Sequence, residues 1–140
     1  MILLDVNVLV RAHRTDYPGG PETLEWLEQA LASPEGVAVW DSVLISAYRV
    51  LTLPLHVREA DALERAMAFL QEVRDASVVV GAGNKYWNIA RHLIESVHAT
   101  GNLVTDAAVA AVSIENGCRL ATFDRDFSRF PGLQWFVPLI

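Results

Sequence analysis

Short apolar runs alternate along the chain with longer stretches in which apolar residues recur every three or four positions. The short runs predict β-strands at 2–4, 37–40, 77–80 and 119–123, with a weaker fifth at 135–137. The first, second and fourth runs each lead into an aspartate, at Asp5, Asp41 and Asp124. This alternation predicts an α/β domain with a central, mainly parallel sheet of four to five strands flanked by helices.

The longer stretches carry apolar stripes with helical spacing. Four stripes predict amphipathic helices that face the core: Leu24, Leu27 and Leu31; Val43, Ala47, Val50 and Leu51; Leu63, Met67 and Leu70; Ile89, Leu93 and Val97. Pro21 marks the start of the first of these helices, and Pro54 the end of the second. A further helix at 107–114 is apolar nearly all round, so we expect it to be buried, with Thr105 as its N-cap and Asp106 in its first turn.

Composition narrows the class of protein. The 140 residues are 52% hydrophobic and 20% charged, which suits a single domain spanning 1–140. The apolar start is too short and too charged for a membrane span and has no signal-peptide pattern, so we expect a soluble, cytoplasmic protein. Cys118 is the only cysteine, which excludes an intrachain disulfide. The net charge of -6 argues against broad electrostatic binding to nucleic acid, unless clustered carboxylates hold cations.

Three aspartates stand where an apolar segment gives way to a new element. They are Asp5, Asp106 and Asp124, and in a parallel sheet such points converge at the carboxyl edge of the strands. Hard oxygen ligands with few histidines nearby favour Mg²⁺ or Mn²⁺ over Zn²⁺. Each acid also has a structural interpretation. Asp5 is equally well read as a helix N-cap, Asp106 as a first-turn residue favoured by the helix dipole, and Asp124, like Asp126, as a turn residue.

Four arginines are candidate phosphate contacts because they lie near these acids: Arg11, Arg14, Arg49 and Arg125. The alternative, favoured for each one singly, is a solvated or ion-paired surface residue. The four histidines, His13, His56, His92 and His98, show no metal-ligand spacing with one another.

Four segments together resemble the PIN-domain ribonucleases, in particular the VapC-type toxins of bacterial toxin–antitoxin pairs. The segments are LLDVNVL at 3–9, GNLVTDA at 101–107, ATFDRDF at 121–127 and FPGL at 130–133. The resemblance covers essentially the whole chain. It implies a parallel sheet flanked by helices, a divalent-metal site, endonucleolytic cleavage of RNA, and inhibition by a cognate antitoxin.

The resemblance also assigns residues. It implies that Asp5, Asp106 and Asp124 are the metal-binding catalytic acids, and that Asn7 and Thr122 order the site, with Asp126 as a further support. Many relatives carry a second acid, a Glu six residues beyond a Ser on the helix after the second strand. Counting from Ser42 places Tyr48 there, so this chain departs from the pattern.

Two other acids are candidates for the missing second carboxylate. Asp41 ends the second strand, although an N-cap role is favoured for it. Glu115 lies nine residues beyond Asp106, about two and a half helical turns away.

Two other functions compete with a metal-dependent RNase. A strand-end Asp could be the nucleophile of a haloacid-dehalogenase-type phosphatase, but Asn7 stands where such an enzyme needs a second Asp. A non-catalytic PIN-like module that binds RNA or protein would explain Tyr48 and the acidic charge.

Partners follow from the resemblance as well. It implies a homodimer, and a heterotetramer or larger assembly with the antitoxin. The apolar helical segments 44–55 and 60–70 are candidates for a groove that binds an amphipathic segment of the antitoxin.

Overall fold

A computed structural model describes residues 1–54 and 59–139. Its centre is a five-stranded sheet in the order β3-β2-β1-β4-β5, and every neighbouring pair is parallel. The strands are β1 (Ile2–Leu4), β2 (Val37–Trp40), β3 (Val78–Val80), β4 (Arg119–Ala121) and β5 (Trp135–Phe136). The predicted α/β fold with a parallel sheet is therefore confirmed, including its weakest strand.

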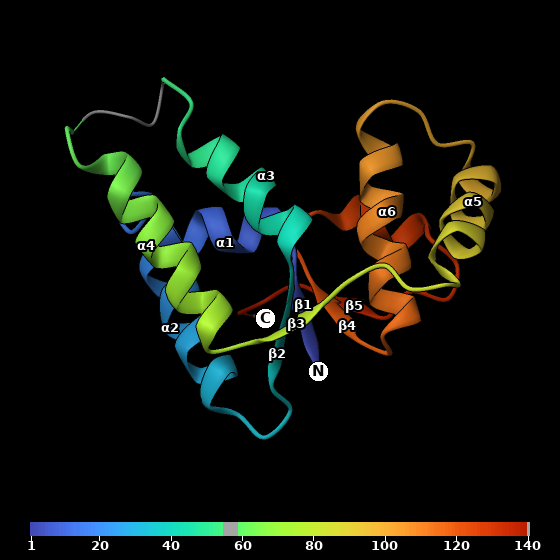
Figure 1. The fold of residues 1–140 in the computed structure, drawn as a ribbon, viewed down its shortest axis with the longest axis horizontal. Coiled ribbons are helices and arrows are strands. Elements are labelled where there is room, and N and C mark those ends of the chain that lie inside the picture. Colours follow the sequence, from blue (N-terminus) through green and yellow to red (C-terminus); the bar gives the residue numbers. More distant parts are fainter. Residues whose placement is uncertain (55–58, 140) are drawn as a thin grey trace.

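Six α-helices and one 3-10 helix accompany the sheet. They are α1 (Val6–His13), α2 (Gly20–Ala32), α3 (Asp41–Leu51), α4 (Ala62–Asp75), α5 (Tyr86–Val97), α6 (Asn102–Glu115) and η1 (Arg125–Arg129). Figure 1 shows α1 to α4 gathered on one side of the sheet and α5 with α6 on the other. The core lies where these layers meet β1 and β4, whose Leu3, Leu4 and Leu120 are fully buried. None of the helices in the described ranges is long and apolar enough to cross a membrane.

The fourth strand is shorter than predicted. It ends at Ala121 instead of at Phe123, although the Thr122 backbone N–H still donates to the Phe136 carbonyl at 3.1 Å. The Thr122 side chain turns to Asp5, and the chain leaves the sheet there to form the loop that carries Asp124.

One predicted apolar stripe was right at Leu70 and wrong at its two other positions. Leu63 and Met67 were expected in the core, but they are 45% and 50% exposed. The buried face of α4 instead consists of Ala66, Leu70 and Val73. Helix α4 is therefore turned so that the small Ala66 packs inward, where a larger side chain would hold the helix away from the core.

The start of α6 was also predicted wrongly. The helix begins at Asn102, after Gly101 takes a φ of 58°, so Thr105 is not an N-cap. Its hydroxyl instead donates to the Asn102 carbonyl at 2.8 Å. Asp106 consequently lies in the second turn, where the helix dipole no longer explains an acid. Leu55, at the end of the segment proposed for antitoxin binding, and His56 lie outside the described residues.

Candidate functional site

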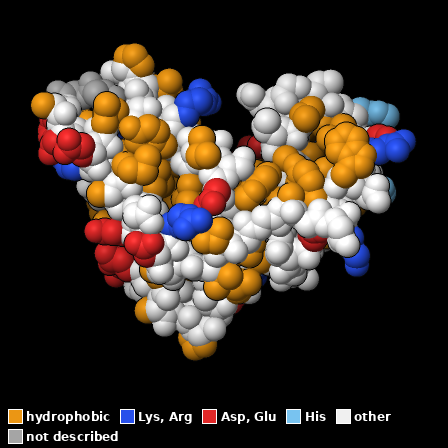
Figure 2. Space-filling view, in the orientation of Figure 1, with side chains coloured by type: hydrophobic (Ala, Val, Ile, Leu, Met, Phe, Trp, Pro, Cys, Tyr) orange, Lys and Arg blue, Asp and Glu red, His pale blue; other side chains and the backbone are white. Residues whose placement is uncertain are grey.

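A cleft of about 870 Å³ lies at the carboxyl edge of the sheet, among α1, α3, α6 and the loop after β4. In the space-filling view it corresponds to the notch between the two lobes of the molecule (Figure 2). Asp5, Asp106 and Asp124 all line it, although they are far apart in the sequence. The structure therefore brings the three predicted acids to one site.

Asp5 is an N-cap whose side chain also lines the cleft. Its Oδ1 accepts a hydrogen bond from the Val6 backbone N–H at 2.8 Å, which caps α1. Its Oδ2 accepts from the Thr122 hydroxyl at 2.7 Å and from the Asn7 amide at 3.0 Å. The residue is only 6% exposed, and burial, with a smaller effect of the Asp124 charge, raises the pKa of its carboxyl. An ionised carboxylate here is held in place but poorly solvated.

Asn7 and Thr122 tie α1 to the loop that carries Asp124. The Asn7 Nδ2 donates to the Thr122 Oγ1 at 3.1 Å, and its Oδ1 accepts from the Phe123 N–H at 3.1 Å. The Thr122 Oγ1 also accepts from the Asp124 N–H at 3.0 Å. These bonds fix the separation between Asp5 and Asp124, which suits a site that has to be rigid.

Asp106 reaches the cleft from the opposite wall. Burial, followed by the like charges of Asp5, Asp124 and Asp126, raises the pKa of its carboxyl to about 6. The burial of this carboxyl group and its three acidic neighbours thus both disfavour its ionisation. A bound cation would relieve this repulsion directly.

Asp124 is both a turn residue and a cleft residue. Its Oδ1 accepts from the Asp126 N–H at 2.9 Å and so caps η1, while the side chain lines the cleft. Asp126 itself is exposed and does not line the cleft. Its contact with the site is therefore the backbone hydrogen bond to Asp124, together with a weak electrostatic effect on Asp106.

The three acids do not form a closed cage. In residues 1–54 and 59–139, no group of three or more His, Cys, Asp or Glu side chains lies close enough together to surround an ion. An open set of hard oxygen donors still fits Mg²⁺ chemically, because that ion keeps several waters and takes only one or two carboxylates together with phosphate oxygens.

Tyr48, which the sequence count places at the missing second acid, does not line the cleft. It packs in the groove between α3 and α4, away from Asp5, Asp106 and Asp124. The polar residues of α3 that line the cleft are instead Ser42, Ser46 and Arg49. Because α3 turns about 100° per residue, its two faces carry different residues, and the face toward the cleft has no acid.

Neither substitute acid reaches the cleft. Asp41 was favoured as an N-cap, but α3 begins at this residue, and its carboxylate forms a two-bonded ion pair with Arg74 at 2.8 and 3.1 Å. Glu115 accepts from the backbone N–H groups of Gly83 and Lys85 at 2.6 and 2.9 Å. It therefore secures the loop before α5.

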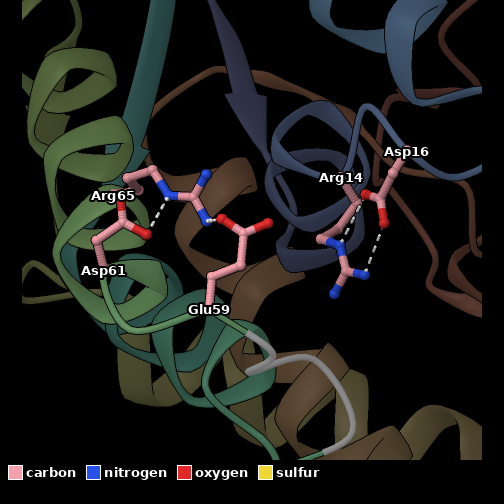
Figure 3. Close-up of polar contacts among 5 residues, drawn as sticks. All are labelled: Arg14, Asp16, Glu59, Asp61 and Arg65. Carbon is pink, nitrogen blue, oxygen red and sulfur yellow. Dashed lines mark hydrogen bonds and ion pairs between the residues drawn. The ribbon is translucent and has the colours of Figure 1, made fainter.

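The four candidate arginines differ in whether they line the cleft. Arg11, Arg14 and Arg49 line the cleft, whereas Arg125 lies outside it. Arg14 forms a two-bonded ion pair with Asp16, both distances being 3.2 Å (Figure 3). Three arginines thus face three aspartates in the cleft, so the local charge differs from the acidic net charge of the chain.

The sequence reasoning missed several polar residues of the cleft. Ser42 served only as a reference for counting, while Ser46, Asn102 and Thr105 were not considered for the site, although all four line it. Ser42 and Ser46 are four residues apart, a spacing that places two side chains on the same face of a helix. This spacing could have identified the two serines together.

Known proteins resemble this chain in sequence and in fold. The family profile described as PIN domain matches residues 2–133. Ribonuclease VapC25 of Mycobacterium tuberculosis is 30% identical over 142 residues, covering 100% of both chains. Ribonuclease VapC43 of the same species is 35% identical over 143 residues, covering 99% of this chain and 96% of its own. The fold also resembles VapBC2 of Rickettsia felis, solved with a promoter DNA fragment, with a TM-score of 0.75, 18% identity and 99% coverage of each chain.

Proposed function

The chain belongs to the PIN-domain family, and from this premise we propose that it is a divalent-metal-dependent endoribonuclease of the VapC type. One observation carries the proposal for the site. Asp5, Asp106 and Asp124 line one cleft at the carboxyl edge of the sheet, and their charges act on one another there. Such a cluster is costly to fold without a cation, which makes a metal-binding role the best explanation of it.

The cation that fits is Mg²⁺ or Mn²⁺. Asp5 and Asp106 would hold it directly, and Asp124 directly or through water, because hard oxygen donors prefer these ions. When bound, the ion supplies Lewis-acid activation for hydrolysis of a phosphodiester bond. The Thr122 hydroxyl and the Asn7 amide keep the Asp5 carboxylate aimed and anchored. Ser42 and Ser46 of α3 also line the cleft.

The substrate of this proposal is RNA, and the protein would act in the cytoplasm. The arginines that line the cleft suit a phosphate backbone despite the net charge of -6, since they lie where the strand would bind. A haloacid-dehalogenase-type phosphatase is disfavoured, because Asn7 is committed to Asp5, Thr122 and Phe123 and cannot act as an acid.

A cognate antitoxin and a second copy of the chain are the proposed protein partners. Several large apolar side chains are exposed on α3, α4 and α5, among them Ile45 at 72%, Met67 at 50% and Trp87 at 68%. Figure 2 shows hydrophobic side chains gathered on the face over these helices. Such a face is more apolar than an isolated protein needs, which supports its use in assembly.

A defined cleavage assay tests the proposal. The chain should cut single-stranded RNA with Mg²⁺ or Mn²⁺ and not with EDTA, and Asp5→Asn or Asp106→Asn should reduce the rate at least about 100-fold. Asp126→Asn is the matched control, since this nearby acid lies outside the cleft and should retain most of the activity. RNA binding without cleavage at saturating metal would instead support the non-catalytic module.

A further inference from the structure

Arg11 is held in an unusually defined position on the wall of the cleft. Its guanidinium carbon lies 4.3 Å from the centroid of the Phe123 ring. Gly19 also lies against this group, because a Cβ at this glycine would overlap the Arg11 Nη2 and come within 2.7 Å of its Nε. The guanidinium is thus in contact with an aromatic ring and with a stretch of backbone that has no side chain.

Arg11 is also left without an anionic partner. Three arginines in the described ranges lie over aromatic rings: Arg11, Arg14 and Arg119. Arg14 forms an ion pair with Asp16, and Arg119 donates two hydrogen bonds of 2.7 Å to the Glu35 carboxylate. For Arg11 no carboxylate is found within ion-pair distance among the described residues, and its buried Nε has no hydrogen-bond acceptor there. An unpaired buried N–H of a charged group is costly and calls for an explanation.

We propose that Arg11 is a pre-positioned phosphate-binding residue, held by Phe123 and Gly19 so that its guanidinium grips a backbone phosphate of RNA beside the three aspartates. This inference rests on the proposed function, because it names how that site holds its substrate. The planar fork of a guanidinium matches two phosphate oxygens, and an arginine that is already immobilised loses little entropy on binding.

The support of Arg11 is continuous with the carboxylates of the cleft. Phe123 directly precedes Asp124, and its backbone N–H donates to Asn7, which bonds Asp5. The residue whose ring supports Arg11 therefore belongs, through its backbone N–H, to the hydrogen-bonded network of the carboxylates. A phosphate on Arg11 would be placed at a fixed distance from them.

RNA binding tests the proposal without requiring cleavage. A short fluorescent single-stranded RNA of mixed sequence is titrated in EDTA over a range of salt concentrations, with all variants carrying Asp106→Asn to reduce repulsion. Arg11→Ala should raise Kd about tenfold at low salt, and the slope of log K against log salt should fall by about 0.7, the share of one phosphate contact on a single strand. Arg11→Lys should weaken binding but retain the slope, because it keeps the charge without the fork.

A substitution at Gly19 tests the position of the Arg11 side chain without changing Arg11 itself. Gly19→Ala should displace the guanidinium and reproduce the weaker binding, yet it should have no further effect when combined with Arg11→Ala. Gly132→Ala is the matched control: Gly132 has a φ of 82°, close to the 84° of Gly19, but a Cβ added there would meet no atom of the described residues within 4 Å. It imposes the same backbone strain and should leave RNA binding unchanged.

The outcomes separate this inference from the proposed nuclease. An unaltered slope in a folded Arg11→Ala variant, additive effects of the two substitutions, or no measurable RNA binding by the parent would overturn the role of Arg11. If Arg11→Ala does not fold, Arg11→Gln replaces it, since Gln keeps a planar polar end and removes the charge. If Arg11→Ala lowers the slope by about 0.7 but the parent chain never cleaves RNA, the role of Arg11 is upheld and the nuclease is rejected.

Discussion

At the scale of single residues, Asp106 is the acid whose ionisation the fold disfavours most clearly. Its pKa is raised to about 6 from an ordinary value of 3.8, by burial and by its acidic neighbours. The folded protein therefore retains a proton that the unfolded chain loses as the pH rises between these values. Stability contributed by this group is present at low pH and is lost as the pH rises through about 6.

The variant Asp106→Asn should consequently be more stable than the parent at neutral pH when no metal is present. We expect a gain of about 1 kcal/mol in the free energy of unfolding, a value reduced because the side chain is only half-buried. Urea unfolding in EDTA measures it, and the gain should vanish near pH 4. Asp126→Asn, at an exposed acid outside the cleft, should show no such gain. A loss of stability in Asp106→Asn at neutral pH would contradict the assignment of repulsion to this residue.

Arg49 gives a second prediction at this scale. Arg49 and Arg125 are both exposed, and neither forms an ion pair within the described part of the chain, but only Arg49 lines the cleft. Arg49→Ala should raise KM for RNA about three- to tenfold with little change in kcat. A phosphate contact away from the reacting bond stabilises the bound substrate and the transition state equally, so its loss weakens binding without slowing the chemical step. Arg125→Ala is the control in the same steady-state assay. Equal effects of the two substitutions would show that the arginines act only through net charge.

The residues of the site were predictable to different degrees. Asp5, Asp106 and Asp124 could be found because each interrupts or follows an apolar run, and the parallel sheet then brings them together. Phe123 and Gly19 could not, because an apolar residue and a turn glycine carry no chemical signal of their own. Their role emerges only from the position of the Arg11 side chain.

At the scale of elements, α3 decides how many acids the cleft contains. One face carries Ser46 toward the cleft, and the opposite face carries Tyr48 into the groove with α4. An acid introduced on the first face would join the carboxylate cluster, whereas an acid on the second would be directed to an apolar groove.

Ser46→Glu should therefore tighten Mn²⁺ binding, by about tenfold if the new carboxylate becomes a ligand. Tyr48→Glu should leave metal affinity unchanged and lower the free energy of unfolding by about 1–3 kcal/mol, because it places a charge against apolar side chains. Isothermal titration with Mn²⁺ and thermal unfolding of both variants measure these effects. Tighter binding by Tyr48→Glu would mean that α3 presents its other face to the metal.

Element boundaries explain where sequence interpretation failed. The strands were found because each lies in a short, mainly apolar run, and an aspartate directly follows β1 and β2. Helix α1 was not among the predicted helices, since the β-branched Val6, Val8 and Val10 hide the helical spacing with which Val8, Leu9 and Ala12 are buried. For α6, the positive φ of Gly101 starts the helix a turn before the capping signal at Thr105. Backbone conformation of this kind is set by tertiary packing as much as by local sequence.

At the scale of the whole molecule, the cleft separates two groups of helices that are joined through the sheet. One wall comes from α1 and α3, and the other from α6, with Asp5 and Asp106 on opposite walls (Figure 1). A cation held by both would cross-link the two groups of helices. It would also neutralise the repulsion that raises the pKa of Asp106.

Metal binding should therefore stabilise the protein, and more strongly at neutral pH than in acid. A ligand present at about 100 times its Kd adds about 2.7 kcal/mol to the free energy of unfolding, which corresponds to a rise in Tm of roughly 5–10 °C for a chain of this size. Below pH 6 the Asp106 carboxyl holds its proton in the metal-free protein, so a cation has to displace it and part of the gain is lost.

Thermal unfolding with and without Mn²⁺, at about pH 7.5 and about pH 5, measures this coupling between metal and proton. Asp5→Asn should abolish most of the shift at both pH values, because it removes a carboxylate ligand altogether. Asp106→Asn should show a smaller shift that no longer depends on pH across this range, while Asp126→Asn should behave like the parent. A shift equal at the two pH values in the parent would mean that the ion binds without engaging Asp106. The two walls of the cleft would then not be linked by the metal.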